Sequence, residues 1–206
     1  MRKATRVVAA LFGVFAGFGG PEHGYFEILQ GNVRPASLMF PAMGPPCDPA
    51  KVWNACEPAV TVVPSLLVTG ILATIVGLIT MIWAAGFVHK KNGGIVLILQ
   101  CIALLLVGGG VVPPVIGLIA GMVATRIHAP MNVRPGGVSR ILAGLWPWPL
   151  VAFFVWALGE FVVGYYFNEF LLQNGFLILL LIVGLLVLSI VSGTARDLVD
   201  AERAGV

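Results

Sequence analysis

Three long uncharged runs constrain this chain more than any other feature of its sequence. They cover residues 61–88, 95–125 and 170–195. Each is longer than the roughly 20 residues that a helix needs to cross the hydrocarbon core of a bilayer. Only 10% of the 206 residues are charged, against roughly a quarter in an average soluble domain. The sequence therefore predicts an integral membrane protein, with no separate soluble domain.

The number of spans follows from the distribution of Lys and Arg, because cytoplasmic loops carry the excess of these residues. The run 95–125 is interrupted by Gly108-Gly-Gly110 and by Pro113-Pro114, so it is either one kinked helix or a hairpin. A hairpin places every Lys and Arg on one side of the membrane except Arg34 and Lys51, whereas a single helix divides them between both sides. We therefore expect an all-α bundle of about six membrane segments, in which the two short hairpin arms either cross or re-enter. The expected segments cover residues 5–30, 61–88, 95–109, 112–125, 147–168 and 175–192.

This topology places both termini in the cytoplasm and makes residues 31–60 an external loop. The alternative for the N-terminus is a signal peptide, but no convincing small-x-small cleavage site follows the first apolar run. The tail 194–206 is expected to be a short, charged, solvated cytoplasmic helix. The net charge of +3 reflects basic residues at span ends and not a continuous basic stripe, which excludes nucleic-acid binding as a main activity.

The external loop is rich in proline, so it is expected to be a compact cap without a regular helix or a central strand. Cys47 and Cys56 lie within it, in the compartment where disulfides persist. They predict a disulfide, because two cysteines without a nearby histidine are a poor zinc site. Cys101 lies within an apolar run and is expected to be an inert buried thiol.

Ionisable side chains inside spans are costly and therefore indicate functional sites. His23 and Glu27 are four residues apart in the first span, so they share one helix face. Glu22 precedes them, and Glu160 lies about 20 Å into the fifth segment. We expect these four residues to form a cation, proton or ligand site in the outer half of the membrane. The alternative is that they face headgroups or fix helix packing.

Small residues recur along the same span. Glycines at 13, 17, 20 and 24 form a stripe, and Gly117 with Gly121 repeats the four-residue spacing. Such stripes allow close approach of two helices within a membrane. They predict that the first helix is held tightly by a neighbour, which would support a preorganised site at its outer end.

Several segments resemble a group of uncharacterised prokaryotic multi-span membrane proteins. They are EHGYFEILQGN at 22–32, EPAVTVVPSLLVTG at 57–70, KNGGIVLIL at 91–99 and GGGVVPP at 108–114. The likeness covers about the first two thirds of the chain. It implies a multi-span fold in the plasma membrane of a prokaryote, and it carries no activity and no site residues across.

The working hypothesis is a small cation- or proton-linked transporter or permeation protein. One alternative is an accessory membrane subunit of a larger complex, with the bilayer and either further copies or other subunits as its partners. The other is a membrane enzyme or redox subunit that holds a metal ion at His23, Glu27 and Glu22, since carboxylates with one histidine suit iron, manganese or zinc.

Overall fold

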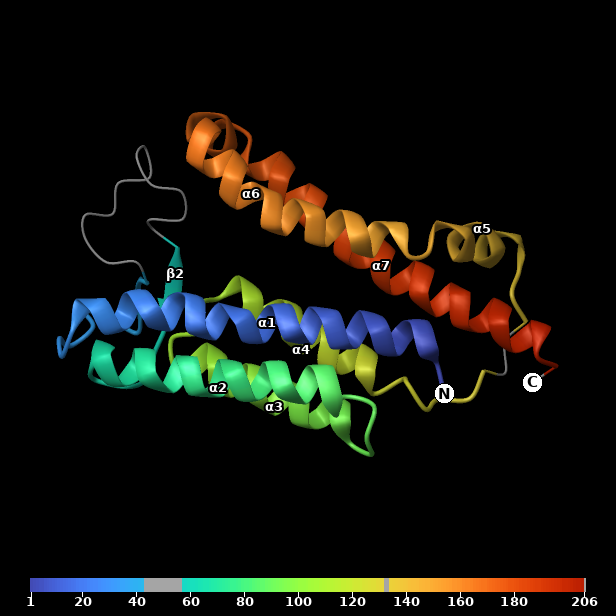
Figure 1. The fold of residues 1–206 in the computed structure, drawn as a ribbon, viewed down its shortest axis with the longest axis horizontal. Coiled ribbons are helices and arrows are strands. Elements are labelled where there is room, and N and C mark those ends of the chain that lie inside the picture. The colour runs from blue at the N-terminus through green and yellow to red at the C-terminus, as the bar shows by residue number, and fades with distance from the viewer. Residues whose placement is uncertain (43–56, 132–133, 206) are drawn as a thin grey trace. The chain divides into compact units, whose positions relative to one another are not determined.

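The computed structural model describes residues 1–42, 57–131 and 134–205, and these are predominantly helical (Figure 1). The chain divides into two compact units. The hairpin unit comprises residues 9–42 and 57–125, and the α7 unit comprises residues 1–8 and 126–205. The elements are α1 (Lys3–Gln30), β1 (Met39–Pro41), β2 (Pro58–Val60), α2 (Leu66–Gly86), α3 (Gly93–Leu106), α4 (Val112–Ala124), α5 (Gly137–Leu145), α6 (Trp148–Gln173) and α7 (Gly175–Arg203).

Four apolar helices are long enough to cross a membrane in the described part of the chain. They are α1, α2, the stretch Gly137–Gln173 that contains α6, and α7. The helices α3 and α4 are apolar but shorter. At 1.5 Å per residue they extend about 21 and 20 Å, less than the roughly 30 Å of a hydrocarbon core. The structure is thus compatible with an integral membrane protein of at least four spans, and six crossings remain a prediction.

Helices α1 and α2 lie side by side (Figure 1). The glycine stripe of α1 faces α2, in agreement with the predicted close packing against a neighbouring helix. A Cβ atom added at Gly24 would lie 2.5 Å from the Gly70 carbonyl oxygen, and one added at Gly17 would lie 2.7 Å from the Gly77 carbonyl oxygen. Since residue numbers rise along α1 as they fall along α2, the two helices are antiparallel. At these positions the two backbones are too close for a side chain larger than that of glycine, and the contact extends to Gly24 in the C-terminal half of α1.

Residues 93–124 form a helical hairpin, and the alternative of one kinked helix is wrong. The arms α3 and α4 are separated by residues 107–111, where Gly108 and Gly110 have positive φ angles of 97° and 78°. Gly117 packs against Cys101, and Gly121 packs against Ile98. Cys101 is fully buried in this contact, as expected for a structural thiol.

The described ends of the proline-rich loop form a small antiparallel sheet. In it β1 pairs with β2, with Phe40 opposite Ala59. Both strands are edge strands, where proline is tolerated, and Pro41 pairs with Pro58 at the end of the ladder. Gln30 donates a hydrogen bond to the Ala42 carbonyl oxygen at 2.7 Å. The loop is thus fastened to the end of α1, while the predicted Cys47–Cys56 disulfide lies outside the described residues.

In the α7 unit, α5 and α6 both pack along α7. Large apolar side chains of α6 and α7 are exposed along much of both helices, as in a helix pair that faces lipid; Leu158, Phe176 and Leu177 are examples. Pro147 precedes the first residue of α6, close to the start predicted for the fifth segment.

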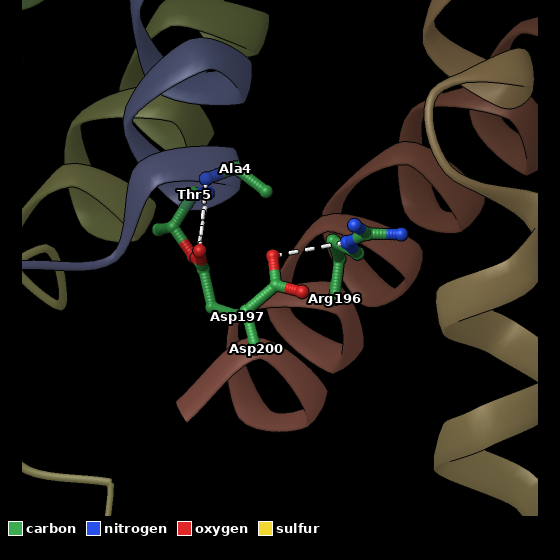
Figure 2. Close-up of polar contacts among 5 residues, drawn as sticks. All are labelled: Ala4, Thr5, Arg196, Asp197 and Asp200. Carbon is green, nitrogen blue, oxygen red and sulfur yellow. Dashed lines mark hydrogen bonds and ion pairs between the residues drawn. The ribbon is translucent and has the colours of Figure 1, made fainter. Parts of the chain in front are cut away.

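Residues 194–203 are helical, as predicted, but two features of this segment differ from those of a short solvated helix. First, α7 continues without a break from Gly175 to Arg203. Second, Asp197 is buried and accepts hydrogen bonds from the Ala4 and Thr5 amides at the start of α1 (Figure 2). A helix start leaves its first amides without intrahelical partners, and this carboxylate supplies them.

Candidate functional site

The candidate site is built on the C-terminal half of α1, in the hairpin unit. His23 and Glu27 are one helical turn apart, and their side chains are 1% and 0% exposed. At 1.5 Å per residue they lie about 30 and 36 Å from the first residue of the helix. The burial of both side chains is consistent with the expectation that they share one face of the helix.

The hydrogen bonds of these two side chains are incomplete. The Nδ1 atom of His23 lies 3.0 Å from the Gly19 carbonyl oxygen. Because a carbonyl only accepts, Nδ1 carries the proton and donates it. The His23 Nε2 atom and both carboxylate oxygens of Glu27 are buried without a hydrogen-bond partner in the described part of the chain. Buried polar atoms are nearly always satisfied, so these three atoms require an explanation.

The turn between α3 and α4 closes over both side chains. A Cβ atom at Gly108 would lie 2.5 and 2.6 Å from the two carboxylate oxygens of Glu27, and one at Gly110 would lie 2.6 Å from Nε2 of His23. No side chain fits at either position without displacing a site residue. Glycine is therefore required at both positions for two reasons. There is no space for a Cβ atom, and the positive φ angles disfavour other residues.

Glu57 approaches the site from the proline-rich loop, directly before β2. Its Oε1 atom lies 3.9 Å from Nε2 of His23, and its side chain is 20% exposed. Burial raises the pKa of the Glu57 carboxyl above its ordinary value. With 20% of its side chain exposed, Glu57 is more accessible than His23 or Glu27.

Two threonines connect the loop to the helices beside the site. The hydroxyl oxygens of Thr61 and Thr69 are 2.9 Å apart, and both residues are buried. Thr61 also forms an isolated antiparallel bridge with Val107, next to the glycine turn. The end of the β-sheet, the start of α2 and the α3–α4 turn are thereby held together around Glu27.

The other two predicted site residues are Glu22 and Glu160. Glu22 is half-buried, and it projects about 100° around α1 from its neighbour His23. Glu160 is half-buried in α6, within the α7 unit, so the site described here is built without it and its part in the site remains a prediction. No group of three or more His, Cys, Asp or Glu side chains placed to hold a metal occurs among residues 1–42, 57–131 and 134–205.

Glu57 is the site residue that the sequence reasoning missed. Two sequence features could have indicated a role for Glu57: it is one of nine acidic residues, and it directly precedes an apolar run. Its contact with His23 could not be predicted, because the two residues are far apart in the sequence and approach each other only when the loop is folded.

No protein-family model, no curated protein and no solved structure matches this chain. The resemblance to prokaryotic multi-span membrane proteins therefore stays a prediction.

Proposed function

We propose that this chain is an integral membrane protein that moves protons or a small monovalent cation, with Glu27 and His23 as the exchange site. The observation that carries the proposal is Glu27. Its side chain is wholly buried, and neither carboxylate oxygen has a hydrogen-bond partner in the described residues. A carboxylate in such surroundings is costly unless a proton, a cation or water accompanies it.

His23 gives the site a second exchangeable position. With Nδ1 donating to Gly19, the neutral ring leaves the lone pair of Nε2 free to take a proton. The imidazole and the carboxylate lie one turn apart on the same helix, so a proton or cation would interact with both. Glu57, nearest the surface, would be the group through which the site exchanges with the external solution.

A proton or monovalent cation is preferred over a resident metal because of the ligand set. Sites for zinc use three or four protein ligands, and the described residues offer no group of three. Permeation is preferred over a purely structural role because a packing residue would have its polar atoms satisfied. In the accessory-subunit alternative, Glu27 satisfies a polar group of a partner helix instead, and the co-purification readout below separates the two.

The test is proton and cation flux into liposomes that contain the purified full chain and a pH-sensitive dye. Glu27→Gln removes the charge with little change in volume and should reduce flux at least tenfold. Glu169→Gln is the matched control, since that carboxylate is exposed at the far end of α6 and binds Gln173. Equal flux for wild type and Glu27→Gln, with both proteins folded, would overturn the proposal.

Two further readouts distinguish the alternatives in the same preparation. Elemental mass spectrometry should find no tightly held transition metal. A stoichiometric metal that is lost in His23→Gln would favour the metal centre. Absence of flux together with a co-purifying protein that Glu27→Gln releases would favour the accessory subunit.

A further inference from the structure

The short helix α5 presents two chemically different sides. Ala143 packs against Ala195 and Val199 of α7. On the opposite side, Val138 and Ile141 are each 71% exposed, and Leu145 is also exposed. Their spacing of three and then four residues places them on one helix face. This apolar face has no partner within the described residues.

The packing partner of α5 determines its level in a bilayer. Arg140 of α5 binds Glu202 at 3.0 Å, and Ala143 contacts Val199. Both contacts are with the charged last part of α7, which follows the uncharged run ending at residue 195. If the uncharged run of α7 lies in the hydrocarbon, α5 lies at the level of the lipid headgroups. Trp148, 70% exposed at the start of α6, fits the same level.

A basic cavity lies between α5 and α7. Its volume is about 260 Å³, and its lining includes Arg140, Arg196, Glu202 and Arg203. Arg140 is paired with Glu202, and Arg196 is paired with Asp200. The side chain of Arg203 forms no hydrogen bond or ion pair with another described residue. Three guanidinium groups against two carboxylates leave the cavity with an excess positive charge.

From this juxtaposition we propose that the edge formed by α5 and α7 binds an anionic phospholipid. The phosphate occupies the cavity beside Arg203 and Arg196, and the apolar face of α5 contacts the acyl chains. Charge complementarity selects this occupant, because guanidinium groups bind phosphate oxygens strongly and an adjacent apolar face favours a lipid over a free anion. The α7 unit carries further positive charge that favours the same leaflet: Arg2, Lys3, Arg6, Arg126 and Arg134.

The proposal rests on the membrane location of the chain and not on its flux, so its test is a binding measurement. The full chain in neutral detergent is titrated with phosphatidylglycerol or with phosphatidylcholine, and bound lipid is counted by native mass spectrometry. Wild type should bind phosphatidylglycerol at least tenfold more tightly, and added salt should reduce this preference. Equal binding of the two lipids would overturn the proposal.

The variant Arg203→Gln should reduce the preference several-fold and leave the unfolding midpoint without lipid unchanged, because Arg203 has no described intramolecular partner. Lys91→Gln is the matched control, since it removes one exposed positive charge from the turn between α2 and α3. An unchanged preference in Arg203→Gln would overturn the assignment of the cavity.

One competitor and one further variant distinguish the other possible occupants. Inorganic phosphate should fail to displace phosphatidylglycerol. Displacement by millimolar phosphate would show that the cavity binds free anions, and would overturn the proposal of a lipid site. Ile141→Ser should weaken lipid binding without changing the oligomeric state. Conversion of a dimer to a monomer by this variant would show that a second copy covers α5, and would overturn the proposal.

Discussion

Asp197, near the end of the last helix, caps the first helix at Thr5. The carboxylate accepts hydrogen bonds from the Ala4 amide at 2.9 Å, the Thr5 amide at 2.8 Å and the Thr5 hydroxyl at 2.7 Å (Figure 2). A negative charge at a helix N-terminus is also favoured by the helix dipole. The two ends of the chain are thereby joined by one buried side chain.

Asp197→Ala should lower the free energy of unfolding by about 2–3 kcal/mol, because it leaves two buried amides and a hydroxyl without their charged acceptor. Asp197→Asn, which keeps one acceptor oxygen, should fall between this variant and wild type. The measurement is unfolding in mixed detergent micelles. Asp200→Ala is the control: its exposed bond to Arg196 at 3.0 Å should contribute about 0.5 kcal/mol or less. Equal losses in Asp197→Ala and Asp200→Ala would contradict the capping role.

Much of the helical architecture could be predicted because the signals are local. Uncharged runs indicate helices, the glycine and proline interruption indicates two arms, and a four-residue glycine spacing indicates close packing. Each of these is a property of neighbouring residues or of one helix face. The structure agrees with them in α2, in the α3–α4 hairpin and in the contact of Gly24 with Gly70.

The rest depends on contacts between residues far apart in the sequence. Asp197 lies in a charged segment, which is typical of a solvated end, and nothing near it indicates that the start of α1 needs an acceptor. In the candidate site, His23 and Glu27 could be paired from their spacing on one helix. Glu57 could not be paired with them, because its approach to His23 depends on the fold of the proline-rich loop.

Gly24→Ala should destabilise the α1–α2 contact. The new Cβ atom would lie 2.5 Å from the Gly70 carbonyl oxygen, and the backbone there can move only if the helices separate. We expect a loss of about 1–3 kcal/mol, measured by unfolding in detergent. Gly86→Ala is the control, since nothing lies within 4 Å of its Cβ position. The higher helix propensity of alanine should make that variant neutral or slightly more stable, so the same sign for both would contradict the packing argument.

The stability of the protein should fall as the pH rises above the ordinary pKa of a glutamate. Burial raises the pKa of Glu57, so in this pH range the folded state binds more protons than the unfolded state. The free energy of unfolding then decreases with pH. Glu57→Gln has no proton to lose, so its unfolding midpoint should vary less with pH than that of wild type. If the two proteins show the same pH dependence, Glu57 does not determine it. The dependence then comes from another titratable group, such as His23, which faces Glu57.

Gly110→Ala should disrupt the site more than backbone strain alone can explain. Gly110 and Gly31 both have a φ angle of 78°, so alanine is strained at both positions, by about 1–2 kcal/mol. Nothing lies within 4 Å of a Cβ atom at Gly31, whereas at Gly110 the ring of His23 lies 2.6 Å away. Gly110→Ala should therefore cost about 1–3 kcal/mol more than Gly31→Ala in unfolding experiments, and in liposomes it alone should reduce flux. If the two variants lose the same stability and conduct equally, the α3–α4 turn does not position His23.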